Sequence, residues 1–335
     1  MPPIITVENL QKRFGETHAL AGVSFQVEQG TVLGLLGPNG AGKTTVVRIL
    51  ATLLRADQGT AQVAGFDVAS HPNHVRSIIG LTGQYAAVDE KLTGAENLQM
   101  VGRLLGMSSS AARARSGELL ERFDLSDAGS RQVGTYSGGM RRRVDLAVSL
   151  VGRPEVLFLD EPTTGLDPAS RLELWSITRE LVADGTTVLL TTQYLDEADE
   201  LANRIVVIDS GQVIEEGTAD ELKDRTGGRS LVIEFATSQQ LAAAALLLDK
   251  LALTGSVHRN EAERIASLPV EHDTALAARA ISEISAAEIP IVDFHLHRPS
   301  LDDVFLSLTG YSPATGSKEP TTPDQTSEPR TGTHS

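Results

Sequence analysis

Apolar runs alternate with segments of helical character over the first two thirds of the chain. The clearest runs are residues 31–37 (TVLGLLG), 155–160 (EVLFLD) and 186–192 (TTVLLTT), and the helical segments after them begin at Lys43, Ala169 and Asp196. Strands that are buried on both faces read as near-continuous apolar runs, and their alternation with helices is typical of βαβ units. The pattern therefore predicts an α/β core with a parallel sheet and crossover helices.

A stretch of different character interrupts this alternation. Residues 90–150 carry little strand signal and several helical segments, among them SAARARSGELLERFDL. Helical periodicity without strand-like runs indicates helices packed on one another. We interpret this stretch as a helical subdomain, at about residues 85–150, inserted into an α/β domain that spans residues 1–227.

The pattern changes again after KDRTGGRS. Residues 230–297 read as strand, helix, strand, strand, helix and strand, the order of a ferredoxin-like unit, so we predict a small α+β domain at residues 228–310. In its last strand, His295 and His297 alternate with apolar residues, which predicts the polar face of a half-buried strand and no metal site. Residues 311–335 are rich in Pro, Thr and Ser and are expected to form a disordered tail.

The charge balance narrows the range of partners. The 335 residues include 29 Lys and Arg against 44 Asp and Glu, and the net charge of −15 repels the backbone of nucleic acids. The chain has no cysteine, which excludes a disulfide framework and a thiol nucleophile. No run reaches the roughly 18 apolar residues needed to cross a bilayer, and the N-terminus lacks a signal-peptide core. We expect a soluble protein of the cytosol that does not bind nucleic acid.

A glycine-rich loop lies between the first apolar run and its helix. GLLGPNGAGKTT has the G-x-x-x-x-G-K-[ST] spacing, in which backbone N–H groups and a helix N-terminus surround phosphates. Lys43 would neutralise the β- and γ-phosphates of ATP, and the Thr44 hydroxyl would bind Mg²⁺. A chance glycine-rich turn is the alternative, but the strand before and the helix after favour nucleotide binding. The predicted nucleotide-binding residues here are Gly37, Pro38, Asn39, Gly40, Ala41, Gly42, Lys43, Thr44 and Thr45.

Two acids follow the second apolar run. Asp160 and Glu161 come at the carboxyl end of the predicted strand 156–159, where ligands of open α/β sheets bind. Asp160 is placed to bind Mg²⁺ through water, and Glu161 could polarise the water that attacks the γ-phosphate. Alone, the two acids would be assigned to a helix N-terminal cap. Together with the glycine-rich loop, they indicate catalysis.

A second helix end is suited to anions. In TYSGGMRRRVDLAVSL, Ser137 would cap a helix, and Gly138 and Gly139 leave its first N–H groups uncovered. One ATP cannot easily contact both this helix end and the glycine-rich loop within one compact domain. The three arginines 141–143 are expected to pair within the domain or with an ATP-bound partner, because the chain is strongly acidic.

The order of these motifs carries a family resemblance. The phosphate loop, SGG before a basic helix, LFLDEP and TGLD resemble the motifs of an ATP-binding cassette ATPase. The resemblance implies a head-to-tail homodimer in which each ATP, with Mg²⁺, lies between the phosphate loop of one subunit and the SGG helix of the other.

Three further residues take their expected roles from this resemblance alone. Phe14 (QKRFG) matches an aromatic residue on which adenine stacks, with an ordinary core phenylalanine as an equal alternative. Gln84 (GLTGQY) matches a loop glutamine that reaches Mg²⁺, so the implied metal ligands are Thr44, Gln84 and Asp160. Asp167 (TGLD) matches a loop acid that contacts the partner subunit.

Longer stretches resemble a narrower group. GLTGQYAAVDEKLTGAENL, YSGGMRRRVDLA, LTTQYLDEADELA and RPSLDDVFLSLTG are similar to the daunorubicin-resistance type of drug-exporter ATPase, over about residues 4–310. The resemblance implies a peripheral protein at the cytoplasmic face of the membrane, where ATP-driven closure of its dimer moves a separate integral-membrane permease. Residues 85–98 would help to form the groove for the permease, and the tract after residue 228 would assist dimerisation or regulation.

Other classes of cassette protein, and a GTP-driven switch, fit the sequence less well. A DNA-repair or chromosome-maintenance cassette needs a very long coiled coil between the phosphate loop and SGG, and only about ninety residues lie there, too few by heptad counting. A ribosome-associated factor needs two cassettes in one chain, and the SGG helix argues against a GTP-driven switch. Import in place of export stays open, and so does the identity of the substrate.

The chain departs from the family pattern at three positions. Tyr136 and Met140 replace a leucine and a glutamine beside SGG, and we expect these changes to affect packing more than chemistry. Gln193 replaces a histidine at the end of the strand 187–190. Its amide can donate a hydrogen bond to a γ-phosphate and orient water, but it cannot accept a proton near neutral pH. Glu161 would then be the base, with Gln193 as a second catalytic residue; a helix cap is the alternative role of Gln193.

Overall fold

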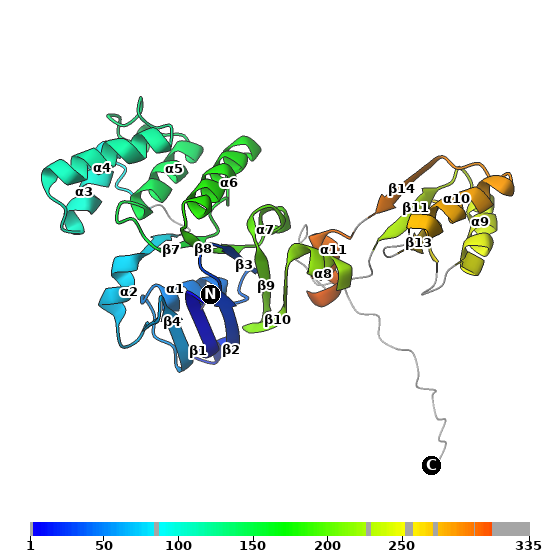
Figure 1. The fold of residues 1–335 in the computed structure, drawn as a ribbon, viewed down its shortest axis with the longest axis horizontal. Helices are drawn as coiled ribbons and strands as arrows, with labels where there is room; N and C mark the ends of the chain where they lie inside the picture. Colours follow the sequence, from blue (N-terminus) through cyan, green and yellow to red (C-terminus); the bar gives the residue numbers. More distant parts are fainter. Residues whose placement is uncertain are drawn as a thin grey trace, which may run out of the picture.

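The computed structural model describes residues 3–83, 87–225, 229–251, 257–270, 274–297 and 299–309. An α/β body with a layer of helices forms the larger part, and a smaller α+β unit follows at the C-terminal end (Figure 1). The tail expected at residues 311–335 lies outside the described residues.

The body is built on a six-stranded sheet with the order β10-β9-β3-β8-β7-β6. Its strands are β3 (Val32–Leu36), β6 (Ile79–Thr82), β7 (Val156–Asp160), β8 (Thr187–Thr192), β9 (Arg204–Asp209) and β10 (Gln212–Gly217). All neighbours are parallel except β10, which pairs antiparallel with β9. Every residue of β3, β7 and β8 is buried, as their apolar runs require. The predicted α/β core is confirmed.

The helices after the three predicted strands begin where expected or one residue earlier. They are α1 (Lys43–Leu50), α6 (Pro168–Ala183) and α7 (Leu195–Leu201). Proline at the first position of α6 is compatible with a helix start, because that N–H has no intrahelical partner.

A second, antiparallel sheet of four strands was not predicted. Its order is β2-β1-β4-β5, with β1 (Ile5–Phe14), β2 (Thr17–Val27), β4 (Gln58–Val63) and β5 (Phe66–Asp67). These strands bury only part of their side chains, so their sequences mix polar and apolar residues and resemble loops. Their buried side chains pack with those of α1 and of the central sheet in one core, so α1 lies between the two sheets.

The helical layer covers the other face of the central sheet (Figure 1). After the short α2 (Pro72–Ile78), it consists of α3 (Gly94–Leu104), α4 (Ser109–Arg122), a 3₁₀ turn (Val133–Thr135) and α5 (Gly138–Ser149). Leu98, Leu119 and Phe123 share a core with Leu157 of β7 and Leu190 of β8. The position of α5 is therefore fixed relative to the carboxyl ends of these strands.

The C-terminal unit has the predicted ferredoxin-like order. It contains β11 (Ser230–Glu234), α9 (Ser238–Leu251), β12 (His258–Asn260), β13 (Ile265–Pro269), α10 (Thr274–Ala286) and β14 (Asp293–His297), with the antiparallel sheet order β12-β13-β11-β14. One detail is wrong: β14 is not half-buried. Phe294 and Leu296 are 53% and 47% exposed, because β14 is an edge strand outside the core of this unit.

The chain enters this unit from α8 (Ala219–Arg225) and leaves it into α11 (Leu301–Thr309). Leu301, Val304 and Phe305 of α11 are buried with Leu222 of α8 and Leu195 of α7. The last described helix thus returns to the α/β body.

Candidate nucleotide-binding site

A cavity of about 460 Å³ lies where β3, β7 and β8 end and α1 begins. The lining residues are Ala19, Asn39, Gly40, Gly42, Lys43, Thr44, Thr45, Glu161, Thr164 and Gln193. The structure therefore brings the glycine-rich loop together with Glu161 and Gln193, three regions that are far apart in the sequence.

The loop can take its path only with glycine at critical positions. Gly42 caps α1 with φ 110°, and a Cβ there would lie 2.6 Å from the Ala19 carbonyl oxygen. A Cβ on Gly37 would lie 2.2 Å from the carbonyl oxygen of Ile208. The first turn of α1 has no acidic residue of its own, and the positive end of its dipole faces the cavity. The loop is suited to bind an anion.

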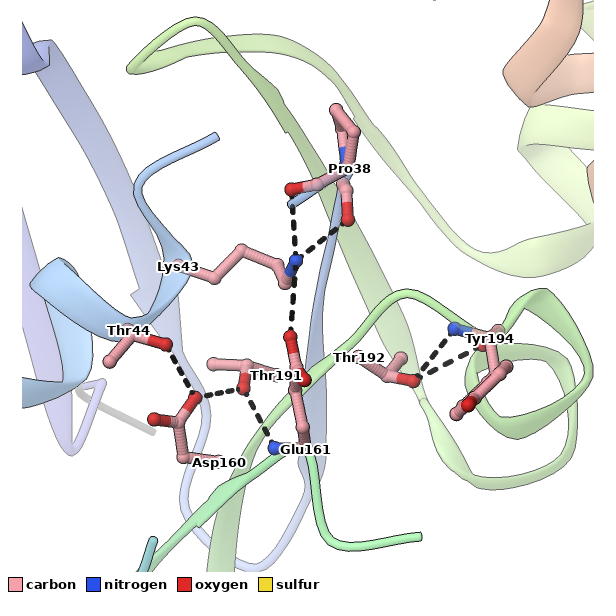
Figure 2. A network of polar contacts seen from close by, with 9 residues as sticks. Pro38, Lys43, Thr44, Asp160, Glu161, Thr191, Thr192 and Tyr194 are labelled. Atoms are coloured by element: carbon pink, nitrogen blue, oxygen red, sulfur yellow. Dashed lines mark hydrogen bonds and ion pairs between the residues drawn. The ribbon is translucent and has the colours of Figure 1, made fainter. Parts of the chain in front are cut away.

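Lys43 is buried beneath this loop. Its Nζ donates hydrogen bonds to the carbonyl oxygens of Gly37 (2.7 Å) and Pro38 (3.1 Å) and lies 3.7 Å from Oε1 of Glu161 (Figure 2). Burial lowers the pKa of Lys43, and the carboxylates of Glu161 and Asp160 oppose this shift. The ammonium group is therefore held at the cavity wall within reach of an anion.

Asp160 is held by two hydroxyl groups. Its Oδ1 accepts hydrogen bonds from Thr44 (3.1 Å) and from Thr191 (2.6 Å) (Figure 2). A hydroxyl and a carboxylate are hard oxygen ligands, and Mg²⁺ commonly takes one or two protein carboxylates and fills its shell with waters and phosphate oxygens. The described residues contain no cluster of three or more His, Cys, Asp or Glu that would cage a metal without phosphate. Thr44 and Asp160 thus fit Mg²⁺ bound together with a nucleotide.

Glu161 has an unusual backbone. Its φ is 51°, in the left-handed region that residues other than glycine rarely adopt. Its N–H donates to the carbonyl oxygen (3.0 Å) and the hydroxyl (3.1 Å) of Thr191. The carboxylate lines the cavity beside Lys43. The chain turns sharply here, and the turn directs the carboxylate into the site.

Gln193 also lines the cavity, one residue after β8 ends. The alternative role as a helix cap is not supported, because the N-cap of α7 is Tyr194 and no side chain caps this helix. The Tyr194 N–H is bonded to the Thr192 hydroxyl at 2.9 Å. The amide of Gln193 is thus available to a ligand.

Several predicted residues do not line the cavity: Gly37, Pro38 and Ala41 of the loop, Asp160, Phe14, Ser137, Gly138, Gly139 and Asp167. Phe14 is 51% exposed at the end of β1, so it is not a core residue. Ser137 caps α5, and Asp167 caps α6 by accepting from the Ser170 N–H at 3.0 Å. Gly139 lies against Ser170, where a Cβ would approach the hydroxyl to 2.5 Å. SGG and TGLD therefore share one surface, apart from the cavity of their own chain. Gln84 lies outside the described residues.

Sequence reasoning missed Thr191, Thr164 and Ala19. Thr191 was visible as a polar residue at the end of an apolar run, the position that also identified Asp160. Its bonds to Asp160 and Glu161 depend on the pairing of β7 with β8, which the sequence alone does not specify.

Comparisons with known proteins agree with this geometry. The ABC transporter family profile matches residues 20–164, and a profile for the C-terminal domain of DrrA1-3-like ATP-binding proteins matches residues 217–309. The daunorubicin resistance ATP-binding protein DrrA3 of Streptomyces coeruleorubidus is 54% identical over 91% of this chain and 96% of its own length. The chain belongs to the ATP-binding subunits of ABC transporters.

A second relative and a solved structure agree with this family membership. The doxorubicin resistance ATP-binding protein DrrA of Mycobacterium tuberculosis (strain ATCC 25618 / H37Rv) is 49% identical over 91% of this chain and 93% of its own. A solved ATP-binding cassette of an ABC transporter in the ADP conformation is 29% identical, with a TM-score of 0.60, over 66% of this chain and 93% of the other. As an ABC ATPase, the chain binds nucleotide and hydrolyses ATP. Within its described part, no helix is long and apolar enough to span a bilayer.

Proposed function

We propose that this ABC ATPase energises the export of a drug or other hydrophobic compound through a separate permease. The observation that carries the proposal is the convergence of Lys43, Glu161 and Gln193 on one cavity at the carboxyl ends of the strands. Asp160 is bonded to Thr44 of the cavity lining. Relatives whose names record daunorubicin or doxorubicin resistance match more than nine tenths of the chain and support the choice of substrate class.

The predicted residues at and around the cavity divide the steps of hydrolysis among them. The loop 37–45 and Lys43 bind the phosphates, and Thr44 and Asp160 would hold Mg²⁺, which neutralises charge that develops on the phosphate oxygens. Glu161 orients and deprotonates the attacking water. Gln193 donates to the γ-phosphate and orients the same water through its carbonyl oxygen. Phe14, exposed at the end of β1, provides a surface on which adenine can stack.

A second subunit would complete the site. The N-terminus of α5 with Ser137, Gly138 and Gly139 lies outside the cavity of its own chain and next to the start of α6. A head-to-tail homodimer would place this helix end on the ATP of the partner, with Asp167 at the contact between subunits. The ATPase domain would span residues 1–227, and residues 228–310 would assist dimerisation or regulation.

The permease is tested by copurification from cells that produce the tagged chain. Detergent extracts of the membrane should yield an integral-membrane protein with the tagged chain, and a wash at high salt without detergent should leave the pair intact. A chain recovered wholly from the soluble fraction, with an ATP-dependent affinity for nucleic acid, would contradict the proposed function.

A further inference from the structure

Arg142 and Asp145 form a charge pair inside the body, on α5. Nη1 of Arg142 lies 3.4 Å from Oδ2 of Asp145, and the two side chains are 10% and 1% exposed. Buried ion pairs contribute little to stability, because desolvation of the charges offsets their attraction. None of the roles assigned above uses this pair, so its contacts call for a separate explanation.

The guanidinium group of Arg142 donates to three backbone carbonyls from two other segments. Nε donates to Pro162 (2.6 Å) and Nη2 to Glu161 (3.4 Å), both in the turn after β7. Nη1 donates to Gly83 (2.7 Å), directly after β6. The donors of a planar guanidinium point in fixed, diverging directions, so one arginine can reach acceptors that are spread too widely for the single nitrogen of a lysine. Arg142 thus joins α5 to the turn that carries Glu161.

Asp145 connects α5 to a further segment of the chain, at Ala87. Its Oδ1 accepts a hydrogen bond of 2.6 Å from the N–H of Ala87. The Arg142–Asp145 pair therefore contacts both Gly83 and Ala87, the described residues on either side of 84–86.

These contacts bear on the strained backbone of Glu161. Left-handed φ angles at residues other than glycine persist only where the surroundings fix them. Thr191 holds the N–H of Glu161, and Arg142 holds its carbonyl and the next one, so both peptide groups around Glu161 are bonded. The direction of the Glu161 side chain depends on these two peptide groups.

We propose that Arg142, paired with Asp145, is a positioning residue that aims the Glu161 carboxylate at the attacking water. This inference rests on the proposed role of Glu161 as the base. Arg142 touches neither the cavity nor a reacting atom, and it acts on the reaction through the backbone of Glu161 and Pro162.

The test separates ATP binding from turnover. Arg142→Lys keeps the charge and removes the fork, and we expect kcat to fall roughly 10- to 100-fold, the usual effect of misplacing a catalytic group by about 1 Å. The dissociation constant for ATP and the thermal midpoint should stay near those of the wild type. Arg115→Lys is the matched control, because Arg115 also pairs with an acid three residues on and donates to a carbonyl, that of Leu150, away from the cavity. This variant should keep its kcat.

Two further variants separate a positioning role of Arg142 from a defect in folding. The double variant Arg142→Gln/Asp145→Ala leaves no unpaired buried charge, so it should fold, bind ATP and be as slow as Arg142→Lys. Adding Arg142→Lys to Glu161→Gln should slow single-turnover hydrolysis no further, because the group to be positioned has already lost its function.

Three results would overturn the inference: wild-type kcat in Arg142→Lys, loss of ATP binding in proportion to kcat, or additive losses in the Glu161→Gln background. Wild-type turnover in Glu161→Gln alone would instead overturn the proposed role of Glu161.

Discussion

At the scale of single residues, Gln193 bears on which side chain can act as the base in the proposed mechanism. It lines the cavity with Glu161, and its amide cannot take up a proton near neutral pH. In the proposed mechanism, proton transfer from water depends on Glu161, whose backbone is held by Thr191 and Arg142. The role we propose for Gln193 is to supply hydrogen bonds to the γ-phosphate and to water.

The first prediction concerns Gln193→Ala. This variant should lower kcat by roughly 10-fold or more, because it removes hydrogen bonds that strengthen as charge develops, and should change the dissociation constant for ATP much less. Steady-state ATPase rates and equilibrium nucleotide binding measure the two effects. Gln193→His retains an N–H donor and should keep most of the turnover. Equal kcat in Gln193→Ala and the wild type would refute the catalytic role.

The second prediction concerns Glu197, a fully buried acid on α7. Burial raises the pKa of Glu197, although its Oε1 accepts a hydrogen bond of 3.2 Å from the Trp175 indole. The folded state therefore holds this proton more tightly than the unfolded chain does, whose carboxyl titrates near 4.5. The contribution of this group to stability is fully present below that pH and is lost as pH rises through the folded pKa.

Glu197→Gln keeps an acceptor for Trp175 and removes the titration. We expect its thermal midpoint to gain on that of the wild type as pH rises from 4.5 to 7. Glu200→Gln on the same helix is the control, since Glu200 is exposed and pairs with Arg179 at the surface. A constant difference in midpoint over this pH range would show that Glu197 does not control the effect.

At the scale of elements, the sequence predicts the parts that are uniformly buried. The strands β3, β7 and β8 are continuous apolar runs, and the helices after them begin near the expected residues. The strands β1, β2 and β4 were missed because one side of each is solvated. The edge position of β14 was missed because exposure depends on which strand lies beside it.

In the candidate site, too, local motifs can be predicted from the sequence and contacts between distant segments cannot. The phosphate loop, Asp160 and Glu161 are recognisable from their spacing and from the strands before them. The contacts of Thr191 and Arg142 cannot be read from the sequence, because they join segments about 20 to 60 residues apart through the order of the sheet.

The third prediction concerns the packing of α11 on the body. Phe305 is 5% exposed in a core with Leu222 and Leu195, so Phe305→Ala should reduce the free energy of unfolding by about 3–5 kcal/mol. Leu246→Ala, at a residue of α9 that is 63% exposed, should change it by less than about 0.5 kcal/mol. Denaturant unfolding measures both. A Phe305→Ala protein as stable as Leu246→Ala would show that α11 is not docked on the body.

At the scale of the whole molecule, the proposed dimer can be tested through a glycine whose side-chain position is empty. A Cβ on Gly138 meets no atom within 4 Å, so Gly138→Asp should fold, and an acid in the first turn of α5 suits the helix dipole. The same carboxylate would repel the ATP of a partner subunit, so ATPase activity should fall roughly 100-fold. Gly117→Asp on α4, where a Cβ also meets open space, should keep its activity.

The Gly138→Asp variant is the fourth prediction, and mixing it with a second inactive variant tests directly whether two subunits share each site. In a dimer of Lys43→Ala with Gly138→Asp, one site carries both defects and the other carries none. An equal mixture should recover about a quarter of the wild-type rate, because random pairing makes half of the dimers mixed and one site of each is intact. The ATPase rate of the mixture, compared with each variant alone, measures this recovery. A mixture as inactive as its components would contradict a site shared between subunits.

The return of α11 to the body also determines how the ferredoxin-like unit can be removed. A truncation after residue 228 would remove Leu301, Val304 and Phe305. Leu195 and Leu222 would then be exposed to water, which promotes aggregation. An internal excision that joins residue 225 to residue 299 through a short glycine-serine bridge would spare this packing. Loss of transport after a simple truncation would therefore report on a damaged ATPase, whereas the excised protein would reveal what the missing unit does.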